Sequence, residues 1–106
     1  MVFPVFLAAA LSVDQARLDE GDRLNEAYVG CLFAVARSAR SREVPKTEFS
    51  TLLAKSCQAE REKLHASLVA ILEQRGNSSA AAEAQWTQLE AQGRAAVERA
   101  YAFPSG

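Results

Sequence analysis

Two cysteines, Cys31 and Cys57, are the residues of this 106-residue chain with the clearest chemistry. A short polar turn, Ser41 to Lys46, separates two long helix-forming segments that carry them. If the first segment ends near Arg40 and the second begins near Thr47, each cysteine lies about 14–15 Å from the turn, because a helix rises ~1.5 Å per residue. A disulfide needs Cα atoms about 4.4–6.8 Å apart, which equal depth on antiparallel helices provides. We therefore predict a Cys31–Cys57 disulfide.

Other uses of the thiols have less support. A structural zinc ion takes four Cys or His ligands, and the chain has only these two cysteines and His65. No Cys-x-x-Cys redox pair and no Cys-x-x-Cys-His haem attachment is present. Buried free thiols, and metal or redox chemistry, stay open as alternatives to the disulfide.

Glu62 and His65 have the Glu-x-x-His spacing of di-iron helical bundles, since positions i and i+3 project from the same side of a helix. A complete site takes two such motifs and two further glutamates, so only a symmetric dimer of this chain would assemble it. A dimeric metal-binding bundle is therefore an alternative, while for the single chain we predict neither metal nor cofactor. The lone histidine lacks a partnered Ser or Cys nucleophile and a glycine-rich phosphate loop, so we predict a protein that is not an enzyme.

Four cations, Arg37, Arg40, Arg42 and Lys46, gather around the turn with only Glu43 against them. Cations suit a helix C-terminus and a solvated loop, which is the simpler interpretation. Contact with an anion or an acidic partner is the alternative. No aromatic residue is interleaved with these cations, and the net charge is −1, so we predict no nucleic-acid binding.

Three helical segments should position these residues. The first runs from Asp14 to Arg40 without a proline. Its stretch from Ala27 to Ala36 carries no charge, and a helix that is apolar all round is buried all round. We therefore expect this helix to be central, with a neighbour on each face, and Gly30 to permit a close helix crossing.

The second helix should start near Pro45 and continue to Arg75, with Gly76 as its stop. Glu60 and Arg61 interrupt its apolar stripe, and we expect their charged ends to lie in water. The third helix should run from about Ala80 to Ala102. The apolar face of this third helix matches the second apolar side of the first, and it consists of Ala82, Trp86, Leu89, Gly93, Val97, Ala100 and Tyr101.

The first 12 residues carry no charge and are too few to span a bilayer, which takes about 20 residues. They offer two small-residue cleavage patterns, which end at Ala10 and Ser12, but no Lys or Arg precedes the apolar run. We predict that residues 1–12 are a signal peptide or else an apolar N-terminal arm, and that residues 13–106 form one helical domain. A lasting disulfide implies an oxidising compartment and is consistent with export.

One resemblance rests on the residues around the two cysteines, Ala27-Tyr28-Val29-Gly30-Cys31 and Cys57-Gln58-Ala59-Glu60-Arg61. An aromatic residue three positions before the first cysteine, with Cys-x-x-Glu at the second, resembles a group of small uncharacterised bacterial secreted or periplasmic proteins. The resemblance covers about residues 24–72. It implies export and a disulfide hairpin, and it carries no activity.

Together these features predict an all-α fold, namely a disulfide-stapled antiparallel helical hairpin with a third helix packed on the first. For function they predict a non-enzymatic, periplasmic or secreted protein, a protein-interaction or structural module of the cell envelope. A protein partner or self-association is expected, with no stable membrane span after processing. The alternatives are the dimeric metal-binding bundle using Glu62 and His65, and an anion or acidic-partner binder at the basic turn 37–46.

Overall fold

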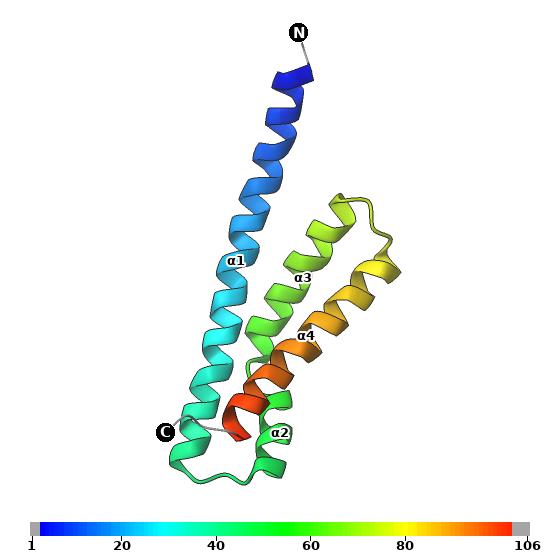
Figure 1. The fold of residues 1–106 in the computed structure, drawn as a ribbon. Helices are drawn as coiled ribbons and strands as arrows, with labels where there is room; N and C mark the ends of the chain where they lie inside the picture. Colours follow the sequence, from blue (N-terminus) through cyan, green and yellow to red (C-terminus); the bar gives the residue numbers. More distant parts are fainter. Residues whose placement is uncertain (1–2, 103–106) are drawn as a thin grey trace.

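Four helices make up the fold in the computed structural model, which describes the backbone of residues 3–102 and the side chains of residues 15–101. Within that range there is no strand, so the predicted all-α class is confirmed. Helix α1 descends the length of the molecule, α3 returns antiparallel to it, and α4 descends again (Figure 1). The bounds are α1 Phe3–Ser41, α2 Lys46–Lys55, α3 Gln58–Gln74 and α4 Ser79–Ala102.

Helix α1 begins earlier than predicted, at Phe3 rather than at Asp14. Pro4 is compatible with this start because the first turn of a helix does not need the amide hydrogen that proline lacks. The residues that follow are mostly alanine and leucine, which are strong helix formers, and no breaker separates them from Asp14. The choice between a signal peptide and an apolar arm for residues 1–12 stays a prediction.

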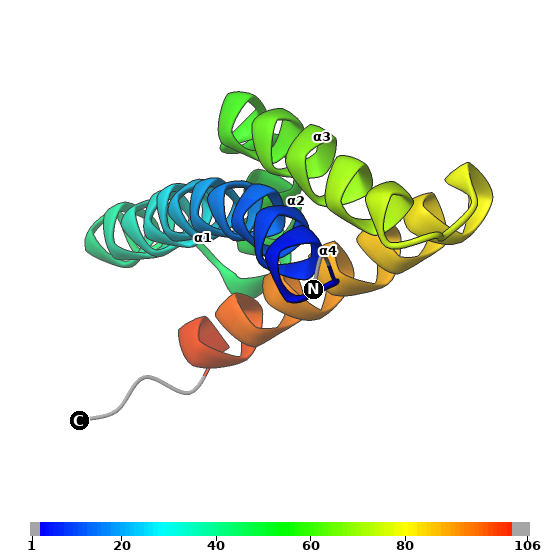
Figure 2. The same cartoon turned by 90° about the horizontal axis from the view of Figure 1, so that it is seen from above.

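The predicted second helix is two helices, because the chain breaks at Cys57. The backbone of Cys57 is in the left-handed conformation, with φ 59° and ψ 34°, and this residue separates α2 from α3. The Ser56 hydroxyl donates a hydrogen bond to the Leu52 carbonyl oxygen at the end of α2. The break lets α2 pack on α1 and α4, while α3 lies along α1 (Figure 2). A single straight helix could not follow both paths.

Helix α1 has neighbours on only part of its surface, so the expectation that residues 27–36 are buried on all sides was wrong. Tyr28, Leu32 and Ala36 are buried against the other helices, but the Phe33 side chain is 41% exposed. A Cβ atom placed on Gly30 would meet nothing within 4 Å, so the close crossing predicted there does not occur. The close approach is at Gly21 instead, where a Cβ atom would lie 3.3 Å from Cδ1 of Ile71 on α3.

The hydrophobic core joins all four helices and is tightest where α2 meets α1 and α4. Phe49 of α2 is 1% exposed and stacks on Tyr101 of α4, with ring centroids 3.8 Å apart. The Tyr101 hydroxyl donates a hydrogen bond to the Val44 carbonyl oxygen, which fixes the chain entering α2. The predicted packing of the last helix on the first is confirmed, since α4 contacts both α1 and α3.

Candidate functional site: an apolar groove between α1, α3 and α4

The predicted disulfide is present and ties the middle of α1 to the break between α2 and α3. Cys31 and Cys57 are bonded, with their Cα atoms 6.0 Å apart, and neither cysteine is free. The thiol alternatives, whether free, metal-bound or redox-active, therefore do not describe this structure. The bond holds α1 at the point where the chain passes from α2 to α3.

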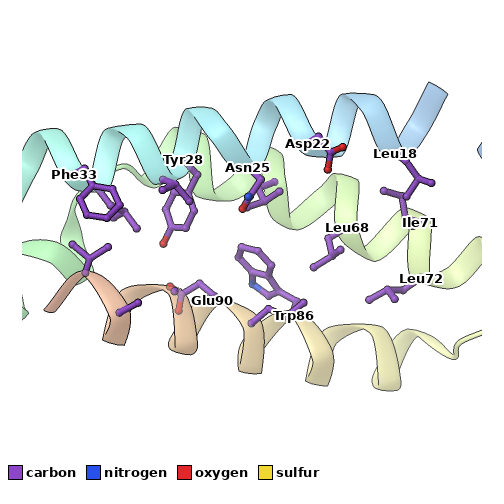
Figure 3. A pocket seen from close by; sticks show the side chains of 18 of the residues that line it. Leu18, Asp22, Asn25, Tyr28, Phe33, Leu68, Ile71, Leu72, Trp86 and Glu90 are labelled. Carbon is purple, nitrogen blue, oxygen red and sulfur yellow. The ribbon is translucent and has the colours of Figure 1, made fainter. Parts of the chain in front are cut away.

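Above this junction, an elongated groove of about 460 Å³ opens between α1 and α4, with α3 as its floor. In Figure 3, side chains from α1 and α4 point toward each other across the gap, and Leu68, Ile71 and Leu72 of α3 lie behind them. Most of the lining is apolar. The lining residues are Leu18, Gly21, Asp22, Asn25, Tyr28, Val29, Leu32 and Phe33 of α1; Leu64, Leu68, Ile71 and Leu72 of α3; Arg75; and Trp86, Leu89, Glu90, Gly93, Ala96 and Val97 of α4.

The groove exists because α1 and α4 meet at one end and separate toward the other (Figure 1). At the meeting end, the Arg40 guanidinium donates hydrogen bonds to the carbonyl oxygens of Ala100 and Tyr101, 3.2 and 3.5 Å away. At the separated end, α3 keeps contact with both helices but does not fill the space between them. Leu89 is left 51% exposed at the groove's edge, and Phe33 of α1, at the end of the groove nearer the disulfide, is left 41% exposed.

A small polar cluster lies in the wall of the groove. The Glu90 carboxylate, whose side chain is 11% exposed, lies 3.0 Å from Nε of Arg94 and 3.5 Å from Nη1 of Arg61. The Tyr28 hydroxyl is buried and forms no hydrogen bond of good geometry among the described residues, but the Arg61 guanidinium is close enough to interact with it. Burial raises the pKa of this hydroxyl, and the Glu90 carboxylate raises it further, although Arg61 and Arg94 act in the opposite direction. Two cations therefore compensate the one largely buried carboxylate.

Arg61 corrects a prediction, because its charged end is not in open water. Its Nη1 atom donates a hydrogen bond to the Ala54 carbonyl oxygen, 3.1 Å away, near the C-terminus of α2. A cation suits that end of a helix, where carbonyl groups lack partners. With its contact to Glu90, this one side chain links α2, α3 and α4.

His65 lies outside the groove lining and is engaged within its own chain. Its Nε2 atom is 2.7 Å from Oε2 of Glu83 on α4, and its ring stacks on Trp86 with centroids 4.9 Å apart. Glu62, its partner in the Glu-x-x-His motif, is exposed. Among the residues whose side chains are described, no group of three or more His, Cys, Asp or Glu residues is placed to hold a metal ion.

The four cations of the basic turn are exposed, and two of them bind main-chain carbonyl groups. Besides its two bonds to the end of α4, Arg40 lies over the Tyr101 ring, with 5.5 Å from its guanidinium carbon to the ring centroid. Arg42 donates from Nε to the Ser38 carbonyl oxygen near the end of α1. Arg37 and Lys46 lie on either side of them. Both bonded arginines therefore stabilise helix ends, which is the simpler of the two interpretations of this turn.

Sequence reasoning identified the residues of the groove but not the groove. The predicted apolar face of the last helix includes Trp86, Leu89, Gly93 and Val97, and all four line it. The helical spacing signalled that this face meets other residues, without signalling that part of it stays uncovered.

Within the described part of the chain, no helix is both long and apolar enough to cross a membrane.

Comparison with known proteins gave no relative: no family model matches the chain, and no similar curated protein or solved structure was found. The groove and the disulfide are therefore the features from which a function can be argued.

Proposed function

We propose that this chain is a non-enzymatic protein-interaction module of the cell envelope, periplasmic or secreted, which binds a protein partner in the groove between α1, α3 and α4. The observation that carries the proposal is the groove itself, an apolar channel that the chain's own helices leave uncovered. An apolar groove between helices is a recurring binding site for an amphipathic helix, which places its apolar side chains in the groove.

The exposed side chains at the groove's edge support this function energetically. Burying a Leu or Phe side chain fully is worth about 1.5–3 kcal/mol, and Phe33 and Leu89 each keep roughly half of their surface in water. A partner helix that covered both, together with the partly exposed leucines of α3, would gain several such contributions. Aromatic side chains are enriched at the desolvated centre of protein interfaces, so Phe33 is the stronger anchor of the two.

The disulfide supports the cellular location. Disulfides persist in the periplasm and outside the cell and are rare in the cytosol. The Cys31–Cys57 bond lies beneath the groove and joins two of the elements that shape it, α1 and the start of α3. An oxidising compartment is therefore the setting in which the groove would keep its form.

Site-directed photo-crosslinking in intact cells tests the proposal. A photoreactive residue replaces Ala96, which lines the groove and is exposed, and a control replaces Ala59, which is exposed on the opposite side of α3. We expect a discrete crosslinked protein from position 96 and none from position 59. Adding Leu89→Glu to the position-96 variant should abolish the product, because a buried charge would oppose the partner's apolar face.

Circular dichroism of the Leu89→Glu variant provides the control for folding, and it should match the parent since Leu89 is already half in water. The proposal is contradicted if position 96 yields no product, if position 59 yields the same product, or if the product survives Leu89→Glu.

A further inference from the structure

An acidic stripe runs along α1 beside the groove. Asp22 and Glu26 lie on the same helical face as Val29 and Phe33, because positions i, i+4, i+7 and i+11 share one side of a helix. Asp22, Val29 and Phe33 line the groove directly. Asp19 extends the stripe one turn further toward the N-terminus. We call Asp19, Asp22 and Glu26 the acidic stripe.

The acidic stripe is not neutralised within the described part of the chain. All three side chains are exposed, and none of them takes part in an ion pair between described residues. Asp19 accepts one hydrogen bond, from the neutral amide of Gln15 at 2.9 Å. Arg23, the nearest cation in sequence, lies one turn after Asp19 and one turn before Glu26, on their side away from the groove, and it forms no ion pair with either.

The α3 and α4 sides of the groove do not carry the negative charge that α1 carries. On α4, the exposed lining residues Leu89, Gly93 and Ala96 are uncharged, and Glu90 is compensated by Arg61 and Arg94. Arg75 is the one cation among the lining residues and lies just past the end of α3. The groove therefore has an apolar floor, an uncharged edge on α4 and a negative edge on α1.

From this arrangement we infer that the partner segment is a basic amphipathic helix, with its apolar stripe in the groove and its Lys or Arg side chains over the acidic stripe of α1. The inference rests on the proposed function and adds the chemistry of the partner to it. The groove extends from Leu18 to Phe33 along α1, about 22 Å at ~1.5 Å per residue, which accommodates four turns of a helix. A negative edge attracts a basic helix and repels an acidic one, so it supplies selectivity that an apolar groove lacks.

Peptide binding to the purified, oxidised full chain tests the inference. Three fluorescent peptides of about 18 residues are compared by anisotropy: one with a leucine stripe and lysines beside it, one with the same stripe and glutamates, and one with the lysine peptide's composition in a non-amphipathic order. We expect the lysine peptide to bind most tightly. Its affinity should fall as salt is raised from 50 to 500 mM, because ions screen exposed charges.

Charge reversal on the protein gives the matched comparison. Asp22→Lys with Glu26→Lys should weaken the lysine peptide roughly tenfold and strengthen the glutamate peptide, since two attractive contacts become repulsive. The control, Glu20→Lys with Glu62→Lys, changes the net charge by the same amount at exposed positions away from the groove and should leave both affinities unchanged.

The outcomes separate this inference from the proposed function. If the glutamate peptide binds as tightly as the lysine peptide, or if the two reversals have equal effects, the basic partner is wrong and groove binding stands. If no peptide binds and position 96 also yields no crosslink, both fall. If light scattering shows that the chain dimerises and that Leu89→Ser makes it monomeric, the occupant is a second copy and the basic helix is again overturned.

Discussion

Two regions of this helical assembly treat apolar side chains in opposite ways. At the closed end, where α2 packs on α1 and α4, Phe49 and Leu53 are 1% and 0% exposed. Along the groove, where α3 packs on α1 and α4, Phe33 and Leu89 keep roughly half of their surface in water. Each region has three helices, so the number of helices does not decide burial. What differs is that α2 closes the space between α1 and α4, whereas α3 leaves it open.

Substituting one phenylalanine in each region is the test of this comparison with the largest expected effect. Phe49→Ala should lower the free energy of unfolding by about 3–5 kcal/mol, because it removes a fully buried ring and leaves a cavity beside Tyr101. Phe33→Ala, the same chemical change in the groove, should cost about 1 kcal/mol or less. Urea unfolding followed by circular dichroism measures both. Equal losses would mean that the groove is closed in solution.

Removing the disulfide affects the junction between the closed end and the groove. Cys31→Ser with Cys57→Ser should cost about 3 kcal/mol in the free energy of unfolding, the loop-closure entropy for residues 26 apart in sequence. The double substitution avoids leaving one reactive thiol. Thermal unfolding of the wild type with and without a thiol reductant checks the value, and the reduced protein should match the double variant. A loss below about 1 kcal/mol would show that packing alone holds the junction.

Tyr28→Phe has the smallest expected effect on stability, and it tests the polar contacts in the groove wall. The hydroxyl is buried and forms no hydrogen bond of good geometry, so its removal should change the free energy of unfolding by no more than about 1 kcal/mol. The raised pKa adds a pH dependence. Folding favours the neutral phenol, so its contribution is fully present below the unfolded pKa of about 10 and is lost as pH rises through the higher folded value.

Thermal unfolding of both proteins between pH 8 and pH 11 measures that dependence. Above pH 10 the wild type should lose stability relative to Tyr28→Phe, and below pH 9 the difference should be constant. A stability difference that does not change with pH would mean that the phenol is as accessible to solvent in the folded chain as in the unfolded one.

The end of α3 and the cysteine pair were predictable because local chemistry determines them. Gly76 ends α3 in a left-handed conformation, with φ 98°, as glycine after a helix commonly does. Cys31 and Cys57 were paired from helix rise and turn position alone. These predictions needed no knowledge of how the helices cross.

The break at Cys57 was not predictable from the same rules. Phe49, Leu53 and Cys57 keep helical spacing with Leu64, so the apolar pattern continues through the break without interruption. A left-handed conformation is uncommon for cysteine, and here the tertiary structure imposes it. The groove was hidden for a similar reason, since periodicity tells which face of α4 is apolar but not the angle at which α4 leaves α1.

The disulfide also determines how the chain would carry a mechanical load. Cys31 and Cys57 close a covalent ring that contains the end of α1, the basic turn and all of α2. Tension applied to the two termini passes from α1 directly to α3 through the sulfur atoms, and the residues within the ring carry none of it. At roughly 3.4 Å per extended residue, reducing the bond would let the stretched chain lengthen by about 80 Å more. Stretching would therefore extend the residues before Cys31 and those after Cys57, including α3 and α4, while the residues of α2 stay inside the closed ring.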